Sequence, residues 1–332
     1  MNKDALLSIC IPTYNRADWL DQILANMLPV CVENAIQVFI SDNASPDNTE
    51  EVGKKYASQY ELVHFYRHPE NIGPDDNFEY VLKMADTQYR WLMSDTCYVD
   101  DVADLMDDLS QHDYDACIVS DPYFKGSRSW CLPRQKVVYD DSISVMKEIG
   151  WHLTWISCMI YSQRLVDSMD FRRYKDSSFN QAALIFEPTA NRKCLICFTP
   201  NVEVKNLPSQ NKESGWHYHV FDIMYRNWYL LVMSLPLYYP YEVKKKCIED
   251  NARLPIMLKN YYHLKRRVEG KWTFADLYRN RFFVKQARAN YYTLALMGIC
   301  PRFLLKMGFL IYEPIAHVFR FIKFRIIWKI TK

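Results

Sequence analysis

Apolar strand-like segments alternate with amphipathic helical segments along the first hundred residues of this chain. The segments LLSICIPTYNR, AIQVFISDNAS and YRWLMSDTCYV are apolar runs that end in polar residues. This alternation is typical of a mostly parallel sheet with helices on both faces. Ligands of such α/β sheets bind beyond the carboxyl ends of the strands. Asp42 and Asp95, which close two of these strands, therefore predict a binding site at that edge.

The hydrophobic periodicity predicts the order of the elements. Strands are expected at 6–14, 35–42, 62–67 and 89–94, each followed by a helix, the first capped by Asn15 and the others starting near Asp47, 74–76 and Asp100. The strand-like segments ACIVSDPYF, QKVVY, WISCMIYS and CLICFTP extend the same sheet. Helical periodicity dominates after about residue 207, so we expect a catalytic domain at 1–207 and a helical region at 208–332, with a basic amphipathic tail at 300–332.

Charge is strongly segregated although the formal net charge is only +2. Residues 86–121 contain ten aspartates and a single cationic residue, Arg90, whereas the last thirty residues are basic. An acidic half of this kind repels phosphates, which argues against nucleic acid as a partner.

The ten cysteines do not indicate a disulfide scaffold. Cys10, Cys117 and Cys158 lie inside apolar strand-like runs, which predicts buried, reduced thiols and a cytoplasmic protein. Cys194 and Cys197 form a single CxxC pair without a second pair at ligand spacing, so a zinc site is not expected. We expect neither a signal peptide nor a membrane-spanning helix.

The low glycine content excludes two common nucleotide-binding loops. The first expected strand ends in Pro12-Thr13-Tyr14-Asn15, and the chain contains eight glycines in all. A dinucleotide-binding Rossmann domain needs G-x-G-x-x-G after this strand, and a P-loop needs a comparable glycine pattern. The phosphates of a nucleotide must therefore be neutralised by a cation or by side chains.

Four segments, in this order and at these separations, carry a family resemblance: SICIPTYNRADWLDQIL, VFISDNASPDNT, HPENIGPDDNF and YRWLMSD. The chain resembles the inverting family 2 glycosyltransferases of the GT-A fold, closely over about the first 100 residues and more loosely to about 205. The bacterial enzymes that build O-antigen or capsular polysaccharide are the most similar in this respect. The resemblance implies transfer of a sugar, with inversion, from a nucleotide diphosphate sugar to a glycan acceptor or a polyprenyl-linked glycan acceptor.

The resemblance also implies roles for individual residues. Asp42 would accept a hydrogen bond from the imide of uracil or thymine, which favours UDP or dTDP, and Asp95 would hold Mg²⁺ or Mn²⁺ against the diphosphate. The other residues expected to line the nucleotide pocket are Pro12, Thr13, Tyr14, Arg16, Asn71 and Asn77. The chain departs from the family pattern at Thr96 and Cys97, where further carboxylates are usual.

A histidine downstream is a candidate second metal ligand. His217 lies in SGWHYH, just before an amphipathic helical segment, and helix N-termini attract anions. It can complete the metal shell or meet the diphosphate; the alternative is an ordinary capping or packing residue.

An inverting reaction needs a general base for the acceptor hydroxyl. The family often uses a Glu-Asp pair after the acceptor-side strand, and the segment RYKDSSFNQAALIFE has no such pair. Asp176 is the first candidate and Glu187 the second, each with the alternative of a solvated loop carboxylate. Asp121 is a further acceptor-side candidate. Trp130, Trp151 and Trp155 flank the acceptor-side segment WISCMIYSQRLV and are candidates for contact with a sugar.

The tail predicts a membrane partner. Its seven basic residues oppose Glu313 alone and alternate with bulky apolar residues. A cationic amphipathic helix of this type lies among anionic lipid headgroups, which predicts a peripheral protein on the inner face of the cytoplasmic membrane. The alternative is a helix docked on its own domain or on a partner subunit. For the whole chain, the alternative to an enzyme is a catalytically silent assembly module that binds nucleotide-sugar.

Overall fold

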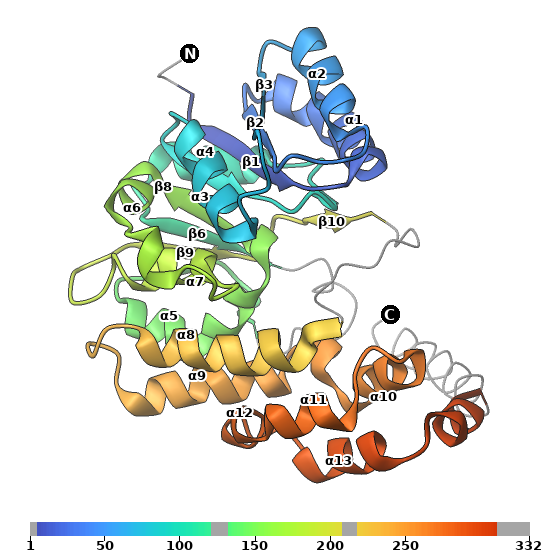
Figure 1. The fold of residues 1–332 in the computed structure, drawn as a ribbon. Coiled ribbons are helices and arrows are strands. Elements are labelled where there is room, and N and C mark those ends of the chain that lie inside the picture. The colour runs from blue at the N-terminus through green and yellow to red at the C-terminus, as the bar shows by residue number, and fades with distance from the viewer. Residues whose placement is uncertain (1–4, 121–131, 208–217, 311–332) are drawn as a thin grey trace, which may run out of the picture. The chain divides into compact units, whose positions relative to one another are not determined.

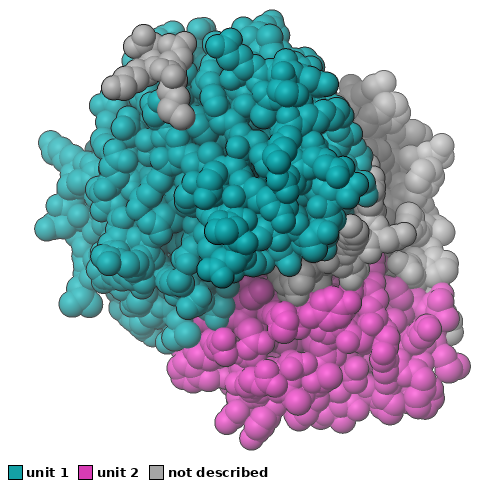
Figure 2. Space-filling view, turned by 45° about the horizontal axis from the view of Figure 1, so that its top comes forward, with its two compact units in different colours: residues 1–212, 227–251 teal, residues 213–226, 252–332 magenta. Residues whose placement is uncertain are grey.

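The computed structural model describes residues 5–120, 132–207 and 218–310 (Figure 1). Contacts divide the chain into two compact units, residues 1–212 with 227–251 and residues 213–226 with 252–332 (Figure 2). The helical region expected from residue 208 is shared between them, because α8 (Trp228–Ser234) and most of α9 (Tyr241–Arg253) belong to the first unit.

The first unit is built on an eight-stranded sheet with the order β3-β2-β1-β4-β8-β6-β9-β7. The strands are β1 (Leu7–Thr13), β2 (Gln37–Asp42), β3 (Val63–Arg67), β4 (Tyr89–Leu92), β6 (Ala116–Val119), β7 (Val137–Tyr139), β8 (Met159–Ser162) and β9 (Ile196–Thr199). Neighbours from β3 to β4 are parallel, β8 runs antiparallel to β4 and β6, and β7 runs antiparallel to β9. The expected mostly parallel α/β sheet is confirmed.

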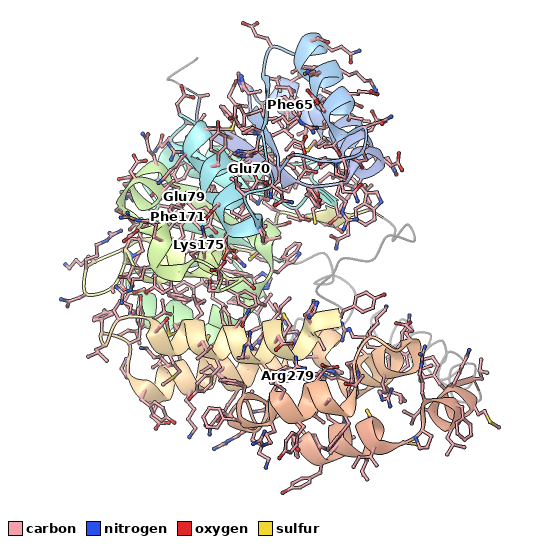
Figure 3. All side chains as sticks on the ribbon, viewed as in Figure 1. Phe65, Glu70, Glu79, Phe171, Lys175 and Arg279 are labelled. Atoms are coloured by element: carbon pink, nitrogen blue, oxygen red, sulfur yellow. The ribbon has the colours of Figure 1, made fainter. Side chains whose placement is uncertain are left out.

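Helices of the first unit follow the strands as expected. They are α1 (Ala17–Glu33), α2 (Thr49–Gln59), α3 (Pro74–Met84), α4 (Ala103–Gln111), α5 (Ser142–Glu148), α6 (Gln163–Ser168) and α7 (Asn180–Phe186). α1 packs on α2, and α3 packs on β1 and β2. Gly53 lets α2 approach β3 closely, because a Cβ atom at this position would lie 2.1 Å from the ring of Phe65 (labelled in Figure 3).

The start of α1 differs from the expectation. Asn15 is not the N-cap: it has a φ of 56°, in the left-handed region, and the capping position belongs to Arg16. The loop after β2 supplies the acceptors instead. Ser45 Oγ accepts from the N–H of Asn15 at 2.8 Å, and Asp47 Oδ2 accepts from that of Ala17 at 3.2 Å. The first helix is therefore capped by a neighbouring loop.

The reversed strand β8 determines what reaches the carboxyl edge of the sheet. Met159, its first residue, pairs with Leu92, the last residue of β4. The two 3₁₀ helices that precede β8, η2 (Gly150–Thr154) and η3 (Ile156–Cys158), therefore lie at the edge where β1 and β4 end. A two-stranded sheet of β5 (Cys97–Tyr98) and β10 (Lys205–Asn206) follows β4 at the same edge.

The second unit is helical. It contains the π-helix η6 (Asp222–Asn227) up to Arg226, the short η7 (Ile256–Leu258), and α10 (Asn260–Glu269), α11 (Phe274–Arg279), α12 (Arg281–Gln286), α13 (Tyr291–Ile299) and a helix at Arg302–Leu310. Trp272, Leu277 and Val284 are buried among these helices. Within the described residues no single helix has the length and apolarity to cross a membrane; Tyr291–Ile299 and Arg302–Leu310 meet these criteria only as a pair bent by 106°.

No cysteine in the described part of the chain forms a disulfide, and all of them except Cys300 are buried. Burial raises the pKa of the Cys10 thiol to about 12 and that of Cys194 to about 11. These thiols are packing residues, as the sequence predicts.

Candidate active site

The strand order reverses between β1 and β4, and a hydrogen bond joins their ends. Thr13 Oγ1 donates to Asp95 Oδ2 at 3.0 Å. Burial raises the pKa of Asp95 to about 6, while the positive charge of Arg16 and the Thr13 hydrogen bond act in the opposite direction. The guanidinium of Arg16 lies 4.1 Å from the ring centre of Trp19. Residues on β1 and after β4 thus form a polar site at the topological switch point.

Tyr14 and Pro12 border this site in different ways. Tyr14 is 46% exposed at the end of β1, so its ring is accessible to a ligand, whereas Pro12 is buried in the strand. Of the four residues expected from PTYNR, the structure therefore brings Thr13 and Arg16 to Asp95 and leaves Tyr14 open to solvent.

Asp42 has a structural role in this conformation. Its side chain is 0% exposed. The carboxylate accepts hydrogen bonds from the backbone N–H and hydroxyl of Ser45 and from Arg67 Nη1 at 3.2 Å. Because Ser45 in turn accepts from Asn15, Asp42 holds the loops after β1 and β2 together. The base contact expected for Asp42 would need surface that this conformation does not expose.

The loop before α3 is fixed to the end of β2. Asn43 Oδ1 accepts from the N–H of Ile72 at 2.8 Å, and its Nδ2 donates to the carbonyl of Gly73 at 3.1 Å. Asn71 Oδ1 accepts from the N–H of Gly73 at 2.9 Å, so this exposed residue shapes the same turn. Asn77 is buried and bonds to the hydroxyl and carbonyl of Ser41. Asn77 therefore anchors α3, and Asn71 is the more accessible of the two.

The two residues after Asp95 explain the departure from the family pattern. Thr96 Oγ1 lies 3.0 Å from Ser94 Oγ, and Cys97 Sγ donates to Asn206 Oδ1 at 2.8 Å. Of the two positions where further carboxylates are usual, Cys97 joins β5 to β10, and Thr96 bonds within its own loop.

Asp95 is the predicted metal ligand that falls within the described residues, and these residues contain no group of three or more His, Cys, Asp or Glu side chains arranged to hold a metal ion. A single carboxylate still fits Mg²⁺, which is commonly bound by one or two carboxylates with substrate phosphates and water.

The segment before β8 is tied to the same edge. Ser157 Oγ accepts from the N–H of Ser94 at 3.0 Å, and its carbonyl accepts from Trp91 Nε1 at 2.9 Å. Trp155 is partly exposed here, whereas Trp151 is 7% exposed and packs into the core. Trp155 is therefore the better placed of the two to meet a sugar.

The loop at 175–178 is clamped onto the start of α3. Lys175 Nζ (labelled in Figure 3) lies 2.7 Å from Asp76 Oδ2. The backbone N–H groups of Ser178 and Asp176 lie near the Asp75 carboxylate and favour its charged form. Asp75 is 7% exposed, and its Oδ2 has no hydrogen-bond partner among the described residues. Burial raises its pKa to about 6, with smaller contributions from the neighbouring carboxylates Asp176 and Asp76.

The two candidate bases lie in different environments. Asp176 is exposed and has a φ of 64°. Glu187, one residue beyond the end of α7, accepts hydrogen bonds from Arg173 and Tyr174. Non-glycine residues held at positive φ cluster at functional sites, and Asp176 is free to face an acceptor, whereas Glu187 is occupied by its partners. Asp121, Trp130 and His217 lie outside the described residues.

Sequence reasoning missed Asn43, Asp75 and Ser157. Asn43 and Ser45 belong to SDNASPDNT, whose density of Asp, Asn and Ser is a signal of side chain to backbone bonding in turns. The PDD at the start of α3 is an ordinary acidic first turn, so nothing local distinguishes Asp75. Its burial depends on a loop a hundred residues away in the sequence.

These features define a GT-A type fold with a polar site at its switch point, and comparisons agree. The 349-residue form of TarS from S. aureus has a TM-score of 0.54 at 12% identity, covering 87% of this chain and 90% of that one. The mannosyltransferase PcManGT from Pyrobaculum calidifontis, in a complex with GDP-Man and Mn²⁺, has a TM-score of 0.52 at 12% identity, covering 93% and 88%. At these identities the likeness concerns the fold.

Residues 8–169, just under half of the chain, match the model of glycosyl transferase family 2. The abequosyltransferase RfbV of Salmonella typhimurium is 28% identical over 214 residues, which make up 58% of this chain and 63% of the relative. The alignment thus spans less than two thirds of that relative.

Proposed function

We propose that the protein transfers a sugar, with inversion, from a nucleotide diphosphate sugar to a glycan acceptor, or to a lipid-linked glycan acceptor, in the synthesis of a bacterial surface polysaccharide. The observation that carries the proposal is the contact of Thr13 with Asp95 beside Arg16, at the switch point of a family 2 domain. The relative named as an abequosyltransferase supports transfer of a sugar without specifying which sugar.

The donor would lie beyond the ends of β1 and β4. The exposed ring of Tyr14 offers a stacking surface for the base, and Arg16 places a fixed positive charge where a diphosphate would meet Asp95. Asp95 would hold Mg²⁺ or Mn²⁺, which when bound neutralises charge on the departing diphosphate. Asp42 supports the walls of this pocket through Ser45.

Asp176 is the residue we assign as general base. It is exposed next to the start of α3, and the Lys175–Asp76 ion pair and Asp75 hold its backbone. A general base contributes about 10²- to 10⁴-fold to a rate. Trp155, on the segment before β8, would contact the acceptor sugar.

The test is transfer with a panel of UDP-, dTDP-, CDP- and GDP-sugars and a polyprenyl-linked glycan acceptor. UDP or dTDP is favoured because a hydrogen-bond acceptor at the end of β2 suits an imide N–H; the other two bases are included because Asp42 is buried. Turnover that is lost in Asp95→Ala supports the proposal. Nucleotide binding without turnover for any donor would instead identify an assembly module.

Peripheral association with an anionic membrane is part of the proposal. Leu296, Ile299 and Phe303 are 71%, 66% and 64% exposed, and Arg302 and Lys306 lie beside them in the sequence. Exposed apolar residues next to cations favour a lipid headgroup region, where a lipid-linked acceptor would be found.

A further inference from the structure

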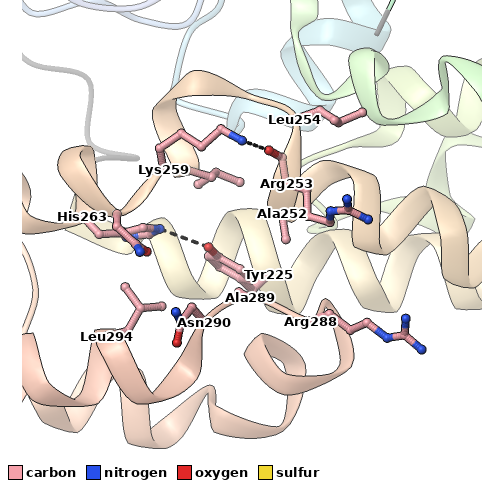
Figure 4. Close-up of a pocket in the computed structure, with 12 residues that line it drawn as sticks. Tyr225, Ala252, Arg253, Leu254, Lys259, His263, Arg288, Ala289, Asn290 and Leu294 are labelled. Carbon is pink, nitrogen blue, oxygen red and sulfur yellow. Dashed lines mark hydrogen bonds between the residues drawn. The ribbon is translucent and has the colours of Figure 1, made fainter.

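The second unit contains a pocket that has no part in the site described above. Its volume is 330 Å³, within the range of small-molecule sites. Tyr225, Leu258, His263 and Leu294 form a buried floor. The charged and polar residues around it are exposed: Arg253 and Lys259 on one side, Arg288 and Asn290 on the other (Figure 4). The pocket thus combines a buried floor with a polar rim.

The charge of the pocket is of one sign. Its lining contains three cations, Arg253, Lys259 and Arg288, and no carboxylate among the described residues. Its setting is equally basic, since residues 252–332 contain seventeen lysines and arginines and three acidic residues. Cations gathered around a concave site raise the local concentration of anions. Lys259 Nζ donates to the carbonyl of Arg253, which keeps the ammonium at the rim.

One of the residues that line this pocket, His263, has a buried nitrogen without a hydrogen-bond partner among the described residues. Tyr225 OH lies 3.0 Å from His263 Nε2, while His263 Nδ1 has no hydrogen-bond partner among the described residues although the side chain is 1% exposed. Burial and the charge of Arg266 lower the pKa of His263 to about 3, so the ring is neutral at physiological pH. Its free nitrogen can donate or accept one hydrogen bond according to the tautomer.

Two backbone irregularities meet at the same place. Tyr225 belongs to a π-helix, Asp222–Asn227, and π-helical turns are frequent at functional sites. Arg288 has a φ of 51°, a conformation that a non-glycine residue rarely adopts. Asn290 caps α13 by accepting from the N–H of Thr293 at 3.2 Å.

We propose that this pocket binds the phosphate or diphosphate group of an anionic ligand, with Arg253, Lys259 and Arg288 as the cationic contacts. Guanidinium groups bind phosphate oxygens in a bidentate manner, and the ammonium adds a point charge. His263 adds a hydrogen bond from the floor. The chemistry is that of a phosphate ester, carried by a lipid headgroup or by a soluble molecule. This site is independent of the sugar-transfer site.

The test uses full-length protein and two probes. Titration calorimetry with inorganic pyrophosphate measures binding of a soluble ligand. The same titration on protein that carries Arg16→Gln, and so lacks a cation of the donor pocket, distinguishes binding at that pocket from binding here. Flotation with phosphatidylcholine vesicles, with and without phosphatidic acid, measures binding of a lipid phosphate. The variant is Arg253→Gln/Arg288→Gln. Its matched control is Arg279→Gln/Arg281→Gln, which removes two charges from the same unit outside the pocket lining.

We expect the pocket variant to weaken binding of one probe or both at least fivefold, and the control to change it less than twofold. Loss of pyrophosphate binding identifies a soluble ligand, and loss of flotation on phosphatidic acid identifies a lipid. The single variant Arg253→Lys retains the charge and should keep most of the affinity that the single variant Arg253→Gln loses. Equal binding of both probes by the pocket variant, the control and the wild type overturns the proposal. Thermal unfolding of each variant verifies that it is folded.

Discussion

Thr13 Oγ1 donates a hydrogen bond to Asp95 Oδ2 over 3.0 Å and thereby joins the carboxyl ends of β1 and β4. Eighty-two residues separate these two side chains in the sequence. The bond orients a half-buried carboxylate whose pKa is raised to about 6. The site thus contains a carboxylate that is costly to keep charged and that is held in one position, a combination typical of functional groups.

Asp95→Asn should abolish transfer and stabilise the fold. Because burial raises the pKa of Asp95 above its ordinary value, its contribution to stability is greatest below pH ~4 and is lost as the pH rises through about 6. At pH 7.5 the neutral amide should raise the free energy of unfolding by on the order of 2 kcal/mol, while kcat falls at least ~100-fold. Denaturant unfolding and steady-state kinetics measure the two effects. Asp107→Asn, at an exposed position, is the control; a destabilised Asp95→Asn protein would contradict this prediction.

Thr13→Val should move the acid limb of the pH–rate profile to higher pH. The Thr13 hydrogen bond stabilises the charged form of Asp95, so its loss raises a pKa that is already about 6. Activity of the wild type is expected to fall as the pH decreases below about 6, and activity of the variant at a higher pH. The profile of kcat/KM between pH 5 and pH 8 tests this, with valine preserving the shape of the residue. An unchanged limb would show that a different group controls it.

Substitutions of the two candidate bases, Asp176 and Glu187, should have different effects on kcat. Asp176→Ala is expected to lower kcat about 10²- to 10⁴-fold without weakening nucleotide binding. Glu187→Gln should change kcat less than about fivefold and should destabilise the protein by about 1–2 kcal/mol, because it weakens the contacts of Arg173 and Tyr174. Kinetics and nucleotide titration on both variants distinguish the roles. The reverse pattern, an inactive Glu187→Gln and an active Asp176→Ala, would transfer the assignment to Glu187.

Asp75 should act through the position of Asp176. Asp75→Ala removes the carboxylate that lies beside the N–H groups of Asp176 and Ser178, so we expect kcat to fall about tenfold or more with an unchanged KM for the donor. Asp75→Asn keeps an oxygen for these N–H groups and should restore most of the rate. A structural role alone would alter the unfolding midpoint of Asp75→Ala without this rescue of the rate.

The exposed apolar residues of α13 and the helix after it should mediate membrane binding. Ile299→Ser/Phe303→Ser is expected to reduce flotation with phosphatidylglycerol vesicles several-fold, because each side chain is more than 60% exposed and loses its insertion into lipid. Leu237→Ser, at a position 98% exposed in the first unit, is the matched control. Equal flotation of both proteins would indicate that this helical face docks elsewhere.

Much of the first unit could be predicted from the sequence, for physical reasons. Strands β1, β2 and β4 are continuous apolar runs because they are buried on both faces, and their predicted limits differ from the observed ones by one or two residues. Asp42 and Asp95 lie at the predicted edge. The orientation of β8 could not be predicted, because its four residues are equally apolar in either direction.

The details of the site depend on contacts between distant segments. Asn15 resembles an N-cap, yet the acceptors at the start of α1 come from Ser45 and Asp47. The carboxylate of Asp42 lies at the predicted edge, but it already accepts hydrogen bonds from Ser45 and Arg67. The sequence indicates which residue types gather at this edge, whereas only the folded chain determines which of them remain open to a ligand.

The reversed direction of β8 has a consequence for how such enzymes diversify. If the strand next to β4 were parallel, the residues that follow that strand would lie at the carboxyl edge of the sheet. Because β8 is antiparallel, the residues that precede it, 150–158, lie there instead. The loops proposed to hold the donor and the segment before β8 are therefore separate inserts that meet at one edge, where Ser157 bonds to Ser94 and Trp91. Under the proposed function, changes of length or sequence before β8 would alter the choice of acceptor while the donor site stays intact.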